Sequence, residues 1–102
     1  MSYCPIQLDK ARNFKYGMKA ISLIEKKLKT PIGKVDMNNL TMEDTATIIW
    51  AGLAHEDKDL TPDKVMHLVD EYSDVQTVIE AMGEALQAAF GSKQGDEEGK
   101  NE

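Results

Sequence analysis

The sequence has few of the residues from which catalytic and metal-binding sites are usually built. Its one cysteine, Cys4, cannot form a disulfide within the chain, which fits a reducing compartment. The two histidines, His55 and His67, are scattered and have too few sulfur partners to predict a zinc site. No Gly-x-Gly-x-x-Gly or Gly-Lys-Ser/Thr loop occurs, and no serine or threonine stands beside an evident base. We therefore expect no enzymatic activity, no catalytic residue, no cofactor and no bound metal.

The acidic segment after residue 54 comes nearest to a metal-binding loop. Asp57, Asp59 and Thr61 have the oxygen spacing with which a calcium loop begins. However, Pro62 stands where the sharp turn of such a loop needs glycine, and Leu68 stands where the bidentate glutamate belongs. The segment is therefore predicted to be a solvated turn.

Long apolar runs are also missing. No stretch approaches the roughly 20 residues that a membrane-spanning helix needs, and the start of the chain lacks the apolar core of a signal peptide. Hydrophobic residues make up 41% and charged residues 29% of the 102 residues, which is the balance of one ordinary globular domain. We expect a cytoplasmic protein without a membrane partner.

Charge is distributed unevenly along the chain. The net charge is −6, but residues 1–34 carry eight basic and two acidic residues, whereas residues 35–102 carry four basic and sixteen acidic ones. The acidic excess makes nucleic acid an unlikely partner for the protein as a whole, although the first third would attract it. Two interpretations stay open. A cationic helix docks on an anionic body, or the basic region of one copy contacts the acidic region of another.

Four amphipathic helices are predicted, and together they define an all-α domain over residues 13–90. The first, over residues 13–28, has an apolar stripe at three- and four-residue steps that begins with Phe14 and Met18. The second begins at Thr41, which is followed by Asp44 as in a capping box, and the third begins at Thr61-Pro62. The fourth follows a further capping pattern at residues 73–76 and runs to about residue 90.

Both ends of the chain are expected to be less ordered than this domain. Residues 1–12 form a weakly specified arm, in which Pro5 and the alternation at residues 6–8 permit a short extended segment without requiring one. Residues 91–102 contain no apolar side chain and are rich in Gly, Lys and Glu. Such a segment has nothing to bury that would offset the entropy of ordering, so it is predicted to be a disordered acidic tail.

Apolar side chains beside the predicted helix stripes are the candidates for a partner-binding surface. The lone tryptophan is explained first by core packing, but a tryptophan at the edge of a stripe is also a common interface anchor. Methionine adapts its shape to different neighbours, so methionines beside the stripes either fill the core or form a binding surface. The candidate partner-binding residues are Met42, Ile49, Trp50, Leu53 and Met66.

Three segments carry a resemblance to a known family. They are Asn-Phe-Lys-Tyr-Gly-Met at residues 13–18, Ile-Ile-Trp-Ala-Gly-Leu-Ala-His-Glu-Asp at residues 48–57, and Leu-Thr-Pro-Asp-Lys-Val at residues 60–65. With this layout, residues 13–90 resemble the tail assembly chaperones of long-tailed phages and of prophages in Gram-positive bacteria. The arm before residue 13 is shorter than in many relatives.

The resemblance implies a helical protein of the bacterial host cytoplasm that is absent from finished virions. Such proteins bind the long tape-measure protein, keep its apolar helices soluble, help tail-tube subunits assemble around it, and often self-associate. The family offers no catalytic residue to carry over. Two other functions stay open: a structural tail or head connector component, and a small helical nucleic-acid-binding regulator that uses Lys15, Lys19 and Lys26.

Overall fold

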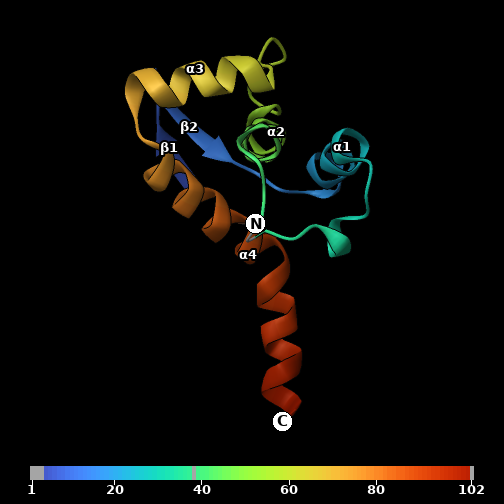
Figure 1. Cartoon of the computed structure of the whole chain (residues 1–102). Coiled ribbons are helices and arrows are strands. Elements are labelled where there is room, and N and C mark those ends of the chain that lie inside the picture. Colours follow the sequence, from blue (N-terminus) through green and yellow to red (C-terminus); the bar gives the residue numbers. More distant parts are fainter. Residues whose placement is uncertain (1–3, 38, 102) are drawn as a thin grey trace.

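The computed structural model describes residues 4–37 and 39–101, with side chains for residues 5–37 and 39–90. Over these residues the chain forms a two-stranded sheet, four α-helices and one 3₁₀ turn (Figure 1). In chain order they are β1 (Cys4–Gln7), β2 (Ala11–Phe14), α1 (Met18–Leu28), η1 (Ile32–Lys34), α2 (Met42–Leu53), α3 (Pro62–Tyr72) and α4 (Val75–Asn101).

The N-terminal segment corrects the expectation of an all-α fold. The predicted start of the first helix at residue 13 is wrong, because residues 4–14 form an antiparallel hairpin in which Gln7 pairs with Ala11 and Cys4 with Phe14. Residues 1–3 of the predicted arm over residues 1–12 lie outside the described residues. The first helix begins only at Met18. The domain is therefore mostly helical, with a small sheet added at its N-terminal end.

A period of two in the burial pattern explains the hairpin. Phe14 is completely buried and Tyr16 is 8% exposed, whereas Met18, which the helical pattern placed on the same stripe as Phe14, is 91% exposed. Alternate side chains of a strand point to the same face, so residues 12, 14 and 16 all face the core. The four-residue step from Phe14 to Met18 resembled a helix by coincidence.

Local capping chemistry fixes the starts of the other three helices. The Thr41 hydroxyl accepts a hydrogen bond from the Asp44 N–H at 3.0 Å, and the Thr61 hydroxyl accepts one from the Lys64 N–H at 3.2 Å. These two predicted starts are confirmed. At α4 the cap is the Asp74 carboxylate, which accepts from the Thr77 N–H at 2.7 Å, one residue later than the pattern at residues 73–76 indicated.

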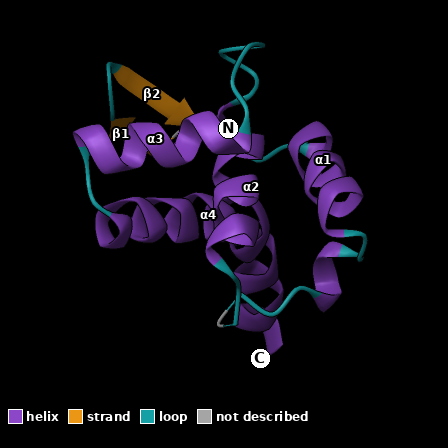
Figure 2. Cartoon of the chain, turned by 45° about the horizontal axis from the view of Figure 1, so that its top comes forward, coloured by secondary structure: helices purple, strands orange, loops and turns teal. Residues whose placement is uncertain are grey.

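Helix α2 is the central element of the fold. Figures 1 and 2 show it between α1 on one side and α3, α4 and the hairpin on the other, and it contacts all four. Eight of its twelve residues are buried, far more than one apolar stripe provides. The largest completely buried side chains of the core come from α2 and from the elements around it: Phe14, Ile24, Ile48, Leu53, Val65 and Val78.

Helix α4 continues beyond the predicted domain boundary near residue 90. Its backbone is helical to Asn101 and extends away from the rest of the molecule (Figure 1). The side chains of residues 91–101 and the whole of residue 102 lie outside the described part of the chain. The expected disorder of an acidic tail over residues 91–102 therefore stays a prediction.

Candidate functional site

Two of the segments that carry the family resemblance contact each other. The Lys15 N–H donates to the Gly52 carbonyl at 2.9 Å, and the Tyr16 hydroxyl donates to the Ile48 carbonyl at 2.7 Å. Burial raises the pKa of Tyr16 well above its ordinary value, so its hydroxyl stays a proton donor. Gly52 leaves room for the tyrosine ring, since a Cβ at this position would lie 2.5 Å from the ring's Cζ.

The turn after α2 holds the end of the hairpin in the same way. The Glu56 carboxylate accepts from the Asn13 backbone N–H at 3.2 Å and from its side-chain amide at 3.4 Å. The Nε2 atom of His55 lies 2.8 Å from the Asn13 carbonyl. We call these contacts, between residues 12–16 and residues 48–57, the hairpin clamp. They give the segments at residues 13–18 and 48–57 a structural role in joining the hairpin to α2.

Arg12 completes the hairpin clamp with two carboxylates. Its guanidinium, on a residue only 3% exposed, makes two hydrogen bonds to Asp9 at 2.9 and 3.0 Å and a longer ion pair of 3.5 Å with Asp57. The hydrogen bonds hold the pKa of Asp9 below its ordinary value and raise that of Arg12. A buried arginine paired in this way joins the hairpin turn to the segment after α2.

These bonded carboxylates predict a loss of stability in acid. Hydrogen bonds from Arg12 mainly lower the pKa of Asp9, and the backbone N–H of Thr77 mainly lowers that of Asp74. Both groups bind fewer protons in the folded chain, so the stability they contribute is complete above about pH 5 and is lost as pH falls through the lowered pKa. Thermal melts of Asp9→Asn from about pH 5 to about pH 2 should show a weaker pH dependence than the native chain. Asp70→Asn serves as the control, because it removes a carboxylate without a described ion pair. If the melting temperature of Asp9→Asn falls with pH as steeply as that of the native chain, the role of the Asp9 carboxylate is contradicted.

The candidate partner-binding residues fall into two groups. Leu53 is completely buried, so in this structure it belongs to the core and is not available to a partner. Trp50 is half-buried; its Nε1–H donates to the Leu60 carbonyl at 2.8 Å, and the Lys27 ammonium lies 5.7 Å from the centre of its ring. These contacts fasten the indole to the protein itself.

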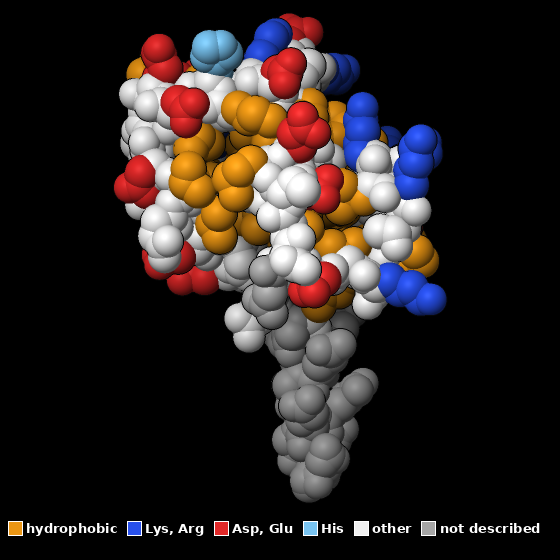
Figure 3. Space-filling view, viewed as in Figure 1, with side chains coloured by type: hydrophobic (Ala, Val, Ile, Leu, Met, Phe, Trp, Pro, Cys, Tyr) orange, Lys and Arg blue, Asp and Glu red, His pale blue; other side chains and the backbone are white. Residues whose placement is uncertain are grey.

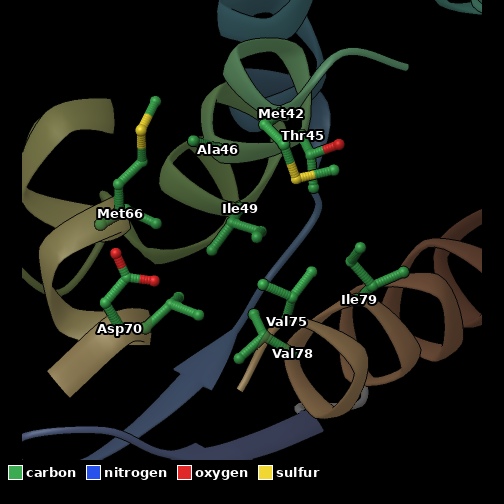
Figure 4. A pocket seen from close by; sticks show the side chains of 11 residues that line it. Met42, Thr45, Ala46, Ile49, Met66, Asp70, Val75, Val78 and Ile79 are labelled. Carbon is green, nitrogen blue, oxygen red and sulfur yellow. The ribbon is translucent and has the colours of Figure 1, made fainter. Parts of the chain in front are cut away.

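The other three candidates, Met42, Ile49 and Met66, line one groove. This apolar groove has a volume of about 230 Å³ and lies between α2, α3 and α4 (Figure 4). Met42, which is 56% exposed, stands on the α2 side, and Met66 lies on α3. The complete lining is Met42, Thr45, Ala46, Ile49, Val65, Met66, Val69, Asp70, Val75, Val78 and Ile79.

Helix α4 supplies the part of the groove that the sequence did not indicate. Val75 and Ile79 belong to its apolar stripe, and Val75 is 45% exposed at the mouth of the groove. Figure 3 shows apolar side chains gathered over this region with Asp and Glu around them, and Lys and Arg mostly at the other side of the same face. The apolar groove is thus an open, aliphatic surface in an acidic setting.

Two larger hollows lie elsewhere on the molecule. One, of about 570 Å³, is also lined mostly by apolar side chains and lies between residues 32–37 and residues 79–90 of α4. The other, of about 490 Å³, lies between α1 and the end of α2, and its lining combines Ala and Leu side chains with Lys15, Lys19, Lys58 and His55. Among the described residues, no group of three or more His, Cys, Asp or Glu side chains could hold a metal ion. None of the described helices is both long and apolar enough to cross a bilayer.

Comparison with known proteins does not assign the chain to a family. No family model matches it. Searches of curated proteins and of solved structures likewise give no match. The function is therefore inferred from the apolar groove and from the resemblance of residues 13–90 described above.

Proposed function

We propose that this protein is a tail assembly chaperone of a long-tailed phage or prophage. It binds amphipathic helices of the tape-measure protein, keeps them soluble and promotes tail-tube assembly around them, in the cytoplasm of the bacterial host. The observation that carries the proposal is the open apolar groove between α2, α3 and α4, with methionines from two different helices at its border. Self-association of the chaperone is part of the same proposal.

The size of the groove defines the way a helix would bind. An apolar cavity of about 150 Å³ holds a benzene-sized molecule, so about 230 Å³ accommodates one or two large aliphatic side chains and not a whole helix. A partner helix would therefore lie across the surface and insert its anchor side chains between Met42 and Met66. The flexible thioethers would adjust to different anchors, as a chaperone for a long repetitive protein requires.

Substitution of the groove methionines tests this function. Co-expression with the product of the long, coiled-coil-rich reading frame expected next to this gene should keep that product in the soluble fraction and allow co-purification. The double variant Met42→Gln/Met66→Gln should lose most of this effect, because it removes apolar contact while keeping side-chain length and helix preference. Met18→Gln, on α1 and 91% exposed in the native chain, is the matched control and should behave like the native protein.

Loss of solubilisation in the double variant, with unchanged circular dichroism and melting temperature, would support the proposal. Equal solubilisation by the double variant and by Met18→Gln would overturn the assignment of the groove. Proteomics of purified particles adds a second readout, because a chaperone should be missing from finished virions, whereas a tail or head connector component should be present.

One observation favours a second function. The hollow lined by Lys15, Lys19, Lys58 and His55 collects basic side chains that a nucleic-acid-binding regulator could use. Phosphate contacts give a steep dependence of affinity on salt. Gel-shift titrations over a series of salt concentrations would therefore reveal this activity, and the absence of any shift at low salt would exclude it.

A further inference from the structure

We propose that the helix bound by the apolar groove carries Lys or Arg next to its apolar face, and that Asp70 pairs with this cation. The inference rests on the proposed function and specifies the chemistry of the partner. It is derived from the charges around the groove, which the apolar lining alone does not explain. The partner is thus a cationic amphipathic helix.

Asp70 is the one charged residue in the groove lining. It is exposed, and no hydrogen bond or ion pair joins its carboxylate to another described residue. It lies in the last turn of α3, where the helix has no basic residue. The carbonyl groups at a helix C-terminus carry partial negative charge, which adds to that of the carboxylate. A cation placed here would be attracted both by the Asp70 carboxylate and by these carbonyl groups.

The charged residues that adjoin the groove lining in the sequence are, apart from Lys64, acidic. Glu43 and Asp44 lie in the first turn of α2, while Asp74 and Glu80 precede and follow the first turn of α4. Figure 3 shows Asp and Glu side chains around the apolar patch and few Lys or Arg side chains among them. Like charges repel, so an acidic helix of equal apolar content should be rejected. A preference for cationic over acidic helices would let the groove distinguish among helices that are equally apolar.

Two designed helical peptides test the inference directly. They share one Leu-containing apolar face, and the flanking positions carry Lys in one peptide and Glu in the other. Fluorescence anisotropy with the full chain should show binding of the Lys peptide about tenfold tighter than that of the Glu peptide at low salt. The difference should shrink as salt is raised, because both partners are exposed to solvent.

Asp70→Asn assigns the effect to one carboxylate. It should weaken binding of the Lys peptide by about two- to fivefold and leave binding of the Glu peptide unchanged or slightly improved. Asp70→Lys should reverse the preference between the two peptides. Asp63→Asn makes the same charge change on the same helix outside the groove lining, and it should leave the preference as in the native chain.

The outcomes separate this inference from the proposed function. If both peptides bind equally and Asp70→Asn has no effect, the cation requirement is wrong, although the groove still binds helices. If neither peptide binds, the proposed function itself fails. If Asp63→Asn and Asp70→Asn weaken binding of the Lys peptide equally, the preference comes from the overall negative charge of the protein and not from a pair with Asp70, and the role of Asp70 is overturned.

Sedimentation experiments test for a different occupant of the groove. If the protein forms an oligomer that the Lys peptide dissociates, a second copy of the chain occupies the groove, and the assignment to a foreign helix is overturned.

Discussion

Leu53→Ala should destabilise the domain by about 2–5 kcal/mol, because it removes a completely buried side chain and leaves a cavity. Leu53 lies at the end of α2, a helix that contacts α1, α3, α4 and β2. Urea denaturation followed by circular dichroism measures the effect directly. A loss of partner binding that accompanies this destabilisation would follow from unfolding and would not identify a contact.

Met42→Ala is the control on the same helix. Its side chain is 56% exposed, so truncation should change the free energy of unfolding by no more than about 0.5 kcal/mol. Its effect should appear in partner binding instead. The opposite pattern, with a stable Leu53→Ala variant that fails to bind its partner, would show that Leu53 belongs to the binding surface and that the burial seen here is not maintained in solution.

Gly52→Ala should also be strongly destabilising, although alanine is the better helix former by about 1 kcal/mol. The added Cβ would lie 2.5 Å from Tyr16 Cζ, 2.7 Å from its hydroxyl oxygen and 2.8 Å from Phe14 Cδ1. Neither ring can move aside freely, because Phe14 is completely buried and the Tyr16 hydroxyl is bonded to the Ile48 carbonyl. Overpacking of this kind costs about 1–3 kcal/mol or more. Because the Cβ would meet three atoms of two buried rings at under 3.0 Å, we expect a cost at the upper end of this range, above the gain in helix preference.

Gly83→Ala offers the same substitution without the collision. No atom lies within 4 Å of a Cβ at this exposed position in α4, so the variant should be about 0.5–1 kcal/mol more stable than the native chain. A loss of stability in Gly52→Ala together with a gain in Gly83→Ala, measured by thermal or urea unfolding, would establish that the hairpin clamp is closed in solution. A gain of stability in Gly52→Ala would mean that the hairpin does not pack on α2 as described.

The helices that the sequence predicted well depend on local signals. Thr41 and Thr61 cap α2 and α3 through bonds to an N–H three residues further on, and such bonds can be anticipated from the sequence alone. The hairpin was missed because its stability comes from distant residues. Asn13 is held by Glu56, and Phe14 faces Gly52, contacts that no short window of sequence contains.

The candidate site was predicted in part for the same reason. Met42, Ile49 and Met66 were identified by their positions beside apolar stripes, and the structure gathers them into one groove. Leu53 belongs to the same stripe, four residues after Ile49, but it lies one turn beyond the groove lining and is completely buried. Asp70 gave no signal at all. The position of this carboxylate at the edge of an apolar groove becomes evident only once α4 is placed beside α3.

The hairpin clamp has a practical consequence for mapping experiments. A chain shortened by its first sixteen residues would lose the strand pair together with Phe14 and Tyr16, and it would uncover the side of α2 around Gly52. An apolar core surface that is exposed by truncation binds other proteins non-specifically. A truncated fragment that captures more protein than the intact chain would therefore report damage to the scaffold, and only point substitutions can locate the native docking surface.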